Sequence, residues 1–225
     1  MHVRRVCVFD VNETLLDLGA LDKHFVTIFG NGSLRNAWFA QFLQSAMVST
    51  VTNSYKKFGD LGIAALEMLA TRHGVRLVEE HRRLIRHGMQ HLPAHQDVRE
   101  CLDELRRAGI RLATLTNSTE EVAEAQLKNA GIRDYFEQVL SADTVQRLKP
   151  ASEPYHMAAD RLGVSIDRVC LVAAHSWDIA GALRAGCAAA FVARPGMVLD
   201  PSFERPDVIG VDLREVSRQI LLRDM

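Results

Sequence analysis

The sequence predicts an α/β fold in which a parallel sheet is covered by helices on both faces and carries a helical insertion. Three observations lead to this prediction. Short apolar runs alternate along the chain with segments of helical periodicity. Each of these helical segments ends at or beside a glycine, which can close a helix. One long stretch in the first half of the chain contains helical patterns alone.

Five of the apolar runs are predicted to be buried strands. Short apolar runs bounded by turn residues are typical of strands that are covered on both faces. Their alternation with helices favours a parallel sheet, and in such sheets reactive groups collect at the carboxyl ends of the strands. The predicted strands span 5–11, 110–116, 137–142, 168–174 and 188–194, and the predicted helices span 96–109, 118–131, 152–163 and 178–186.

The stretch from about residue 18 to residue 91 is predicted to be a helical insertion after the first strand. Its segment 34–51 places Trp38 and Phe42 on one helical face. We expect the chain to return to the sheet near Pro93, so that the insertion covers the end of the sheet where Asp10 emerges. Further helical patterns span 63–74 and 78–90, and a proline-rich loop is predicted over 194–207.

Composition and charge exclude several classes of protein. The chain has 225 residues, of which 48% are hydrophobic, and its formal net charge is −1. That is enough apolar residues for a substantial core, and no basic stripe indicates a nucleic-acid partner. No apolar run approaches the ~20 residues of a membrane span, and the first residues run directly into a predicted strand, so neither membrane insertion nor a secretory signal is expected.

The cysteines predict a reducing compartment. No pair of them forms a C-x-x-C motif, and Cys7 and Cys170 lie inside predicted strands. Buried, reduced thiols in a cytoplasmic protein are therefore expected for Cys7, Cys101, Cys170 and Cys187.

Polar side chains follow the predicted strands at the edge where reactive groups collect. Asp10 ends the first strand, and Thr14 comes four residues later. The second strand ends at Thr116 and Asn117, and Lys149 precedes a proline just before a helix. The fourth strand is followed by the segment Ala174, His175, Ser176, Trp177 and Asp178.

These four motifs, in this order and at this spacing, resemble those of the haloacid dehalogenase superfamily over nearly the whole chain. Each motif alone occurs by chance, whereas four at strand ends or helix starts are specific. The resemblance implies a Rossmann-like core formed by residues 1–17 and 92–225, with a helical cap of residues 18–91 inserted after the first motif.

The resemblance also implies a role for each motif. Asp10 would be the nucleophile, and an ionised carboxylate needs positive charge and hydrogen-bond donors around it. Lys149 would supply the charge, Thr14 a hydroxyl donor, and Asp178 would orient the lysine or a water. Thr116 and Asn117 would present polar groups at the mouth of the site.

Simpler interpretations exist for some of these residues. An aspartate after a strand is often a helix N-cap, although the coincidence of four motifs argues against this for Asp10. For Ser118 we favour the cap, because Ser118 and Glu121 form a capping-box pattern. Trp177 is equally compatible with core packing and with a place in the site.

Two missing acids bear on the reaction. Phosphoryl transfer in this superfamily needs a second acid two residues after the nucleophile, and a further acid near the fourth motif to hold magnesium. Here these positions carry Asn12 and Ala174. Asp10 and Asp178 alone would make a poor magnesium cage, since this ion requires several hard oxygen ligands. No metal or other cofactor is therefore expected.

The 2-haloacid dehalogenases of the superfamily work without metal, because a halide leaves without needing a proton. In them the carboxylate attacks the α-carbon, and water then hydrolyses the resulting ester with net inversion. Several further positions resemble this branch. The resemblance makes Val11, Asn12, Phe58, Asn117, Tyr155 and Trp177 expected substrate-site residues, with Asn117 and Phe58 at the halide.

Some positions depart from this branch. Its best-understood members carry a halide-receiving arginine directly after the cap tryptophan, where this chain has Phe39 after Trp38. Serine and asparagine of the fourth motif are replaced by Ala173 and His175. A histidine there could activate water or could simply be hydrogen-bonded in the pocket. Loss of the cationic group predicts weak dehalogenation or an altered substrate.

The sequence thus favours a metal-independent dehalogenase of small 2-haloacids, and two alternatives stay open. One is a magnesium-dependent phosphohydrolase of the same superfamily. The other is a non-catalytic binding protein on the same fold. By resemblance, a homodimer formed through cap helices is expected, with neither nucleic acid nor membrane as a partner.

Overall fold

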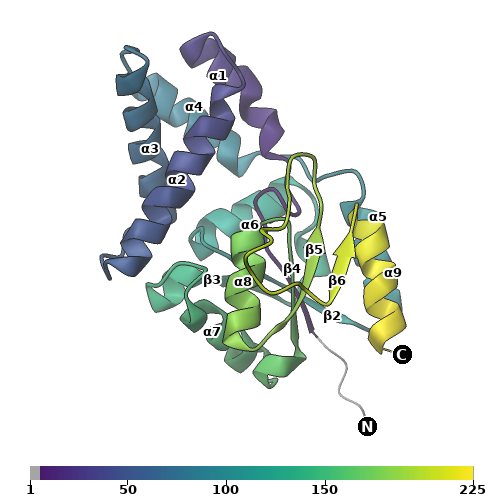
Figure 1. The fold of residues 1–225 in the computed structure, drawn as a ribbon. Helices are drawn as coiled ribbons and strands as arrows, with labels where there is room; N and C mark the ends of the chain where they lie inside the picture. Colours follow the sequence, from purple (N-terminus) through teal and green to yellow (C-terminus); the bar gives the residue numbers. More distant parts are fainter. Residues whose placement is uncertain (1–5, 225) are drawn as a thin grey trace.

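The computed structural model describes residues 6–224 and contains one six-stranded parallel sheet (Figure 1). The strand order is β3-β2-β1-β4-β5-β6. β1 lies at the centre, where it pairs with β2 on one side and β4 on the other. The strands are β1 (Val6–Phe9), β2 (Arg111–Thr116), β3 (Gln138–Ser141), β4 (Val169–Ala173), β5 (Ala188–Val192) and β6 (Val208–Gly210).

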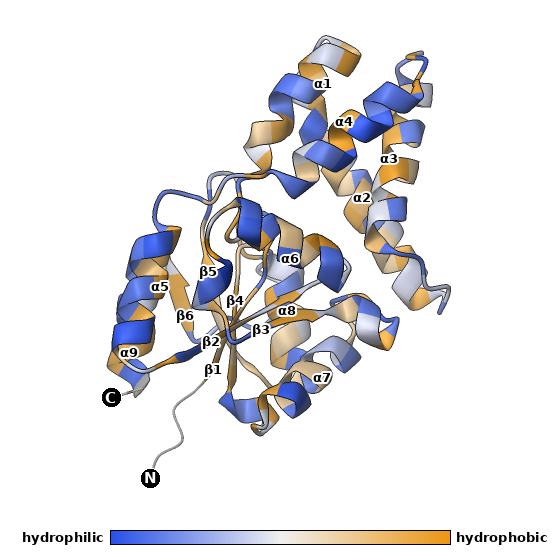
Figure 2. Ribbon diagram, turned by 180° about the vertical axis from the view of Figure 1, so that it is seen from behind, coloured by the Kyte–Doolittle hydropathy of each residue, from blue (hydrophilic) through white to orange (hydrophobic). Residues whose placement is uncertain are grey.

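Helices cover both faces of this sheet, and side chains of β1 enter two separate cores. Cys7 and Phe9 pack with the helices α5, α6 and α9, whereas Val6 and Val8 pack with α7 and α8. Figure 2 shows hydrophilic residues along the outer surfaces of α5 and α9. The helices of the core are α5 (Val98–Arg107), α6 (Glu120–Asn129), α7 (Ser152–Leu162), α8 (Ser176–Ala185) and α9 (Leu213–Asp224).

Between β1 and α5 the chain forms a group of helices that stands over the carboxyl end of the sheet (Figure 1). These helices are α1 (Asp22–Phe29), α2 (Leu34–Val51), α3 (Phe58–Arg72) and α4 (Glu79–Gln90). Within the group, Trp38 of α2 donates its indole N–H to the carbonyl of Gly62 in α3, at 2.8 Å. Short 3₁₀ helices complete the chain at Leu18–Leu21, Arg133–Tyr135, Ala142–Val145 and Ile166–Arg168.

The inserted helices contact the core on two sides. The end of α2 meets the loop before Lys149, where Arg147 donates to the carbonyl of Thr50 at 3.0 Å. Nearer the start of α2, Arg35 lies 3.7 Å from the carboxylate of Glu13, and the ring of Phe39 lies 5.9 Å from that of His175. Helix α2 therefore spans the end of the sheet above Asp10.

The predicted α/β fold is confirmed, and the five predicted strands lie close to their expected limits. The expected start of the first strand at residue 5 and the sequence before it fall outside the described residues. Three elements were not predicted: α1, β6 and α9. β6 is only three residues long and follows a loop with three prolines, which leaves little periodicity to read.

Strand order places the reactive edge at a topological switch point. The connection after β1 crosses to β2 on one side, and the connection after β4 crosses to β5 on the other side, so the loops after β1 and β4 diverge. Such a divergence leaves a crevice at the carboxyl ends of the strands, where ligands of doubly wound sheets bind. Asp10 follows β1 at this crevice, and His175 follows β4.

Candidate active site

Three side chains donate to the carboxylate of Asp10. Lys149 Nζ lies 3.0 Å from Oδ1, the hydroxyl of Thr14 lies 2.7 Å from Oδ2, and His175 Nδ1 lies 3.3 Å from Oδ2. Asp10 itself is only 5% exposed. Burial raises the pKa of this carboxyl, but the charge of Lys149 and the bonds from His175 and Thr14 outweigh it and hold the pKa well below its usual range. Asp10 is therefore an ionised carboxylate directed into a site that excludes bulk water.

The ammonium of Lys149 lies between two carboxylates. Nζ contacts Asp178 Oδ2 at 2.5 Å, and it also donates to the carbonyl of Leu115 at 2.9 Å. Burial lowers the pKa of Lys149, but the charges of Asp10 and Asp178 raise it overall, so the lysine stays charged. The hydroxyl of Tyr155 donates to Asp178 Oδ1 at 2.6 Å, and this completes the partners of the second carboxylate.

Thr14 ties the loop after β1 to the end of β4. Its hydroxyl oxygen accepts from the backbone N–H of Ala174 at 3.0 Å while donating to Asp10. Its carbonyl accepts from buried Arg194 at 2.8 Å, and Arg194 in turn pairs with both oxygens of Asp97 at 2.9 and 2.7 Å. Sequence reasoning missed this support, because residues 14, 97 and 194 are far apart in the chain and share no motif.

Asn117 holds the backbone of Lys149 from two directions. Its Oδ1 accepts from the lysine N–H at 2.8 Å, and its Nδ2 donates to the lysine carbonyl at 3.3 Å. Thr116 accepts from the N–H of Ser118 at 3.2 Å. The amide of Asn117 thus orders the loop that presents the cation to Asp10.

The capping role favoured for Ser118 is wrong. Helix α6 begins at Glu120 with Thr119 at the N-cap position, and no side chain caps it. The carbonyl of Ser118 instead accepts from the hydroxyl of Ser141 at the end of β3, at 2.6 Å. This bond holds residue 118 to the sheet edge, so the helix starts later than its pattern suggested. Asp10 likewise starts no helix, so it is not an N-cap.

Aromatic rings from α2 and α3 form a wall over the site. Phe39, 6% exposed, lies against His175 and at 5.9 Å from the ring of Phe42. Phe42 in turn lies 4.1 Å from Phe58. Trp177 stacks on His175 at 5.1 Å, and Lys149 Nζ lies 5.9 Å from its ring centroid. The structure therefore brings Phe39 and Trp177 to the site, whereas Phe58 lies behind Phe42.

The two residues directly after Asp10 point away from it. Val11 is fully buried in the core. The side chain of Asn12 accepts from the amide of Gln126 in α6, at 3.0 Å. An aspartate at position 12 would be expected to donate a proton toward the site, whereas this amide is engaged with a helix of the core.

Glu13 is the main residue of the site that sequence reasoning missed. Its carboxylate lies 2.9 Å from His175 Nε2, on the side of the imidazole opposite Asp10. Burial lowers the pKa of His175, but the bonds and charges of Asp10 and Glu13 outweigh it and raise the pKa to about 9. The replacement of asparagine by histidine in the fourth motif was visible in the sequence, but its partner was not.

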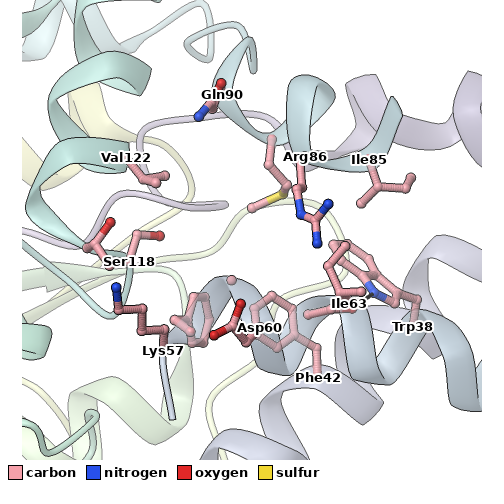
Figure 3. A pocket seen from close by; sticks show the side chains of 15 residues that line it. Trp38, Phe42, Lys57, Asp60, Ile63, Ile85, Arg86, Gln90, Ser118 and Val122 are labelled. Atoms are coloured by element: carbon pink, nitrogen blue, oxygen red, sulfur yellow. Dashed lines mark hydrogen bonds between the residues drawn. The ribbon is translucent and has the colours of Figure 1, made fainter. Parts of the chain in front are cut away.

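A cavity of about 250 Å³ lies between the inserted helices and the start of α6 (Figure 3). Its wall is largely apolar and includes Trp38, Phe42 and Phe58. Arg86 points into it from α4, and Ser118 borders it next to Asn117. Asp10 is not among the residues that line this cavity.

Among residues 6–224, no group of three or more His, Cys, Asp or Glu side chains is arranged to hold a metal ion. In the same part of the chain, no helix is both long and apolar enough to cross a membrane. The four cysteines are buried, as expected, and they form no disulfide within the described part of the chain.

Comparison with known proteins identifies the family. A family model described as haloacid dehalogenase-like hydrolase matches residues 4–186. An (S)-2-haloacid dehalogenase of Pseudomonas sp. strain YL is 30% identical over 213 residues, which are 92% of this chain and 90% of that protein. A second one, 4A of Burkholderia cepacia, is 32% identical over 188 residues, or 81% of this chain and 80% of that protein.

Solved structures agree. A crystal structure of a dehalogenase with an intermediate complex has a TM-score of 0.87 at 28% identity, and it covers 94% of this chain and 95% of its own. The fold also matches that of L-2-haloacid dehalogenase from Xanthobacter autotrophicus, with a TM-score of 0.91 at 24% identity over 99% of this chain and 100% of that one. The resemblance seen in the motifs is thus confirmed, and the chain belongs to the haloacid dehalogenase-like hydrolases.

Proposed function

We propose that this chain hydrolyses the carbon–halogen bond of small 2-haloacids through an ester on Asp10, without a metal ion. One observation carries the proposal: Asp10 is a buried, ionised carboxylate whose charge is balanced by Lys149, while the side chain two residues later is an amide turned toward Gln126. Such a site has a nucleophile but lacks the acid that an alkoxide leaving group needs. The relatives named (S)-2-haloacid dehalogenases support the same substrate class.

The first step forms the ester. An oxygen of Asp10 attacks the α-carbon in line, a carbon–oxygen bond forms, and the halide leaves with the electron pair of the carbon–halogen bond. Lys149 and Thr14 hold the carboxylate in place, which lowers the entropic cost of reaching the transition state. Exclusion of water strengthens these contacts and keeps the carboxylate poorly solvated.

The second step releases the product. Water attacks the carbonyl carbon of the Asp10 ester, the bond between that carbon and the ester oxygen breaks, and the 2-hydroxy acid leaves with inverted configuration. His175 contacts Asp10, so it is placed to exchange a proton with this water. We assign the halide side of the pocket to Phe39, Asn117 and Trp177. The cavity beside Ser118 is the proposed route of entry, with Arg86 and Lys57 as attractive charges for a carboxylate.

The magnesium-dependent phosphohydrolase is not favoured. Its leaving-group acid is replaced by Asn12 and one of its metal acids by Ala174. Lys149 also already contacts both remaining carboxylates. The relatives at 30% and 32% identity are named as dehalogenases, which argues against a binding protein without activity as well.

Halide release is the test of the proposal. The protein is expected to release halide from chloro- or bromoacetate, and from the (S) enantiomer of 2-chloropropionate in preference to the (R) enantiomer. The rate should be unchanged after treatment with a chelator. An activity abolished by chelator and restored by magnesium, with phosphate esters as substrates, would favour the phosphohydrolase.

Phe39→Arg tests the missing cation. A guanidinium at position 39 would face the departing halide with a charge-assisted bond, and we expect halide release in a single turnover to rise by up to about tenfold. Phe39→Leu is the control, because it removes the ring without adding charge. If Phe39→Arg melts like the wild type yet shows no gain, halide departure does not limit the first step.

Three further properties belong to the proposal. The catalytic core is assigned to residues 1–17 and 92–225, and the cap to 18–91. A homodimer through cap helices is supported by exposed apolar side chains on α1, α2 and α3, namely Val26, Val48 and Met68, and light scattering would measure its mass. A cytoplasmic location is supported by four buried cysteines that form no disulfide in the described part of the chain.

A further inference from the structure

We propose that buried Arg194, held by Asp97, is a positioning residue that places the hydroxyl of Thr14 against Asp10 and so sets the rate of ester formation. Both charged side chains act through the backbone of Thr14 and not on the reacting atoms. The effect on rate rests on the proposed dehalogenase function. The placement of Thr14 does not, because it can be measured in the free protein.

The guanidinium of Arg194 divides its hydrogen bonds between one carbonyl and one carboxylate. Nε and Nη2 both donate to the carbonyl oxygen of Thr14, at 3.2 and 2.8 Å. Nη1 donates to both oxygens of Asp97, at 2.9 and 2.7 Å. Bonds from a charged donor are roughly twice as strong as neutral ones, and here two of them converge on one oxygen. The carbonyl of Thr14 is therefore fixed from two directions.

Asp97 is directed toward Arg194 although its place in the chain suggests another use. It occupies the N-cap position of α5, where an aspartate commonly bonds to the first turn, but within the described chain its side chain makes no capping bond. Its Oδ2 instead accepts from the N–H of Leu213 at the start of α9, at 2.7 Å. Burial raises the pKa of Asp97, but the bonds from Arg194 and Leu213 outweigh it and lower the pKa overall. Asp97 is therefore ionised and holds the guanidinium in place.

Both charges of this pair are buried, since Arg194 is 7% exposed and Asp97 is 4% exposed. Removing two charges from water costs about as much free energy as their attraction contributes, so a buried ion pair adds little net stability. Stability of the fold is thus a weak explanation for the pair. Its distinct contribution is the direction that it gives to the carbonyl of Thr14.

The loop that carries Thr14 needs such an anchor because it leads directly into the inserted helices. The 3₁₀ helix Leu18–Leu21 begins four residues later. Next to Thr14, the carbonyl of Leu15 accepts from the N–H of His95 at 3.0 Å, on the connection that returns from α4. Movement of the inserted helices would be transmitted along these two paired connections toward the end of β1. The ion pair ties both of them to the loop after β5 and to the start of α5.

The hydroxyl of Thr14 passes this constraint on to Asp10. Its oxygen donates to Asp10 Oδ2 at 2.7 Å and accepts from the N–H of Ala174 at 3.0 Å. Hydroxyl and carbonyl belong to one residue, so a carbonyl fixed by Arg194 limits where the hydroxyl can lie. Without Arg194 the carboxylate keeps Lys149 but loses a fixed donor at Oδ2, and it reaches the in-line geometry less often.

The variant that removes the anchor combines Arg194→Met with Asp97→Asn and is called the paired variant below. Arg194→Met alone would leave a buried carboxylate without its cation, whereas the asparagine is neutral and its carbonyl can still accept from Leu213. Arg194→Lys is the conservative variant, because it keeps the charge beside Asp97 but lacks the planar fork that reaches the Thr14 carbonyl. If the paired variant does not fold, Arg194→Lys carries the same measurements.

Arg111→Met is the matched control. Arg111 begins β2, at the edge of the sheet opposite the site, and its guanidinium also pairs with both oxygens of a carboxylate, that of Glu137, at 3.0 and 2.7 Å. It also donates to the carbonyl of Leu162 at 2.9 Å. Arg111→Met therefore loses the same kinds of bond, but it should leave both Thr14 and halide release unchanged.

The first measurement is hydrogen exchange of the Ala174 amide in the free protein, followed by NMR. This N–H donates to the hydroxyl of Thr14, so its protection reports where the hydroxyl lies. In the paired variant it should exchange at least about tenfold faster relative to the amide of Val172 in β4, which corrects for any change in overall stability. Arg194→Lys should lie between the paired variant and the wild type, and Arg111→Met should match the wild type.

The second measurement is halide release in a single turnover, which follows ester formation. The paired variant should slow it about ten- to a hundredfold, because the nucleophile is less well placed. The haloacid concentration at half-maximal rate should stay within about twofold of wild type, because the substrate contacts are unchanged.

Thr14→Val tests the route through the hydroxyl. It keeps the shape of the side chain but removes the donor, and it should also slow halide release. Added to the paired variant, it should give the same rate as Thr14→Val alone, because no hydroxyl remains to be placed. A merely structural loss would instead multiply the two effects.

The outcomes separate the parts of the inference. An Ala174 exchange ratio that is the same in the wild type, the paired variant and Arg194→Lys overturns the placement of Thr14 by Arg194. Faster exchange together with multiplied effects on halide release overturns the link to ester formation. If the wild type releases no halide from any 2-haloacid, the proposed function fails, whereas the exchange of Ala174 still decides whether Arg194 places Thr14.

Discussion

Asp10→Asn is expected to abolish halide release, by a factor of at least about 10⁴, as seen when a covalent nucleophile is removed from a catalytic unit. The amide keeps the shape of the side chain but cannot displace a halide from carbon. Lys149 and Thr14 would remain to hold it in place, so binding of the haloacid should survive. Halide release and substrate binding, measured on the same preparation, separate loss of chemistry from loss of the site.

Isotope labelling tests the same assignment without a mutation. In a single turnover in heavy-oxygen water with excess enzyme, the product hydroxyl takes its oxygen from Asp10. The oxygen from water then enters the Asp10 carboxylate, where mass spectrometry of the peptide around residue 10 detects it. Label found only in the product after one turnover would mean that water attacks the substrate directly, and Asp10 would then be a general base.

The positions of Asp10, Lys149 and Asp178 could be predicted because all strands of a parallel sheet end at the same edge of that sheet. Each follows a strand or precedes a helix, and parallel strands bring those points together. Local patterns of this kind also predict most helices. They fail for β6, where three residues carry no readable period, and for Ser118, where a tertiary bond to Ser141 overrides the capping pattern.

Contacts between distant residues could not be predicted in the same way. Glu13 follows Asn12 in what reads as an ordinary turn, and nothing local indicates that its carboxylate reaches a histidine at position 175. No sequence pattern indicates that Arg194 pairs with Asp97 or that it contacts the loop of Thr14. Both contacts depend on how the loops after β1, β4 and β5 lie relative to one another. Their relative positions in turn depend on the packing of the whole sheet.

Lys149→Met is expected to lose both activity and stability. Lys149 is 1% exposed and is the only described ammonium in contact with Asp10 and Asp178, so its loss leaves Asp178 without a cation. Breaking a buried ion pair by removing one partner costs about 3–5 kcal/mol of unfolding free energy. Halide release should fall on the order of a thousandfold, because the nucleophile is no longer held in place.

The pH dependence of this loss identifies its cause. Burial raises the pKa of Asp178 and the charge of Lys149 opposes that rise, so removing the lysine raises this pKa further. A carboxyl whose pKa is higher in the folded than in the unfolded state destabilises the fold least while it is protonated. Its ionisation lowers the free energy of unfolding as the pH rises through the folded pKa. The gap in melting temperature between wild type and Lys149→Met should therefore narrow as the pH falls from 7 toward 5.

Lys128→Met is the control, because Lys128 is an exposed lysine. Its free energy of unfolding should stay within about 0.5 kcal/mol of that of the wild type at every pH. A gap for Lys149→Met that stays constant over this range would mean that lost packing of the lysine stem, and not the uncompensated charge of Asp178, accounts for the instability.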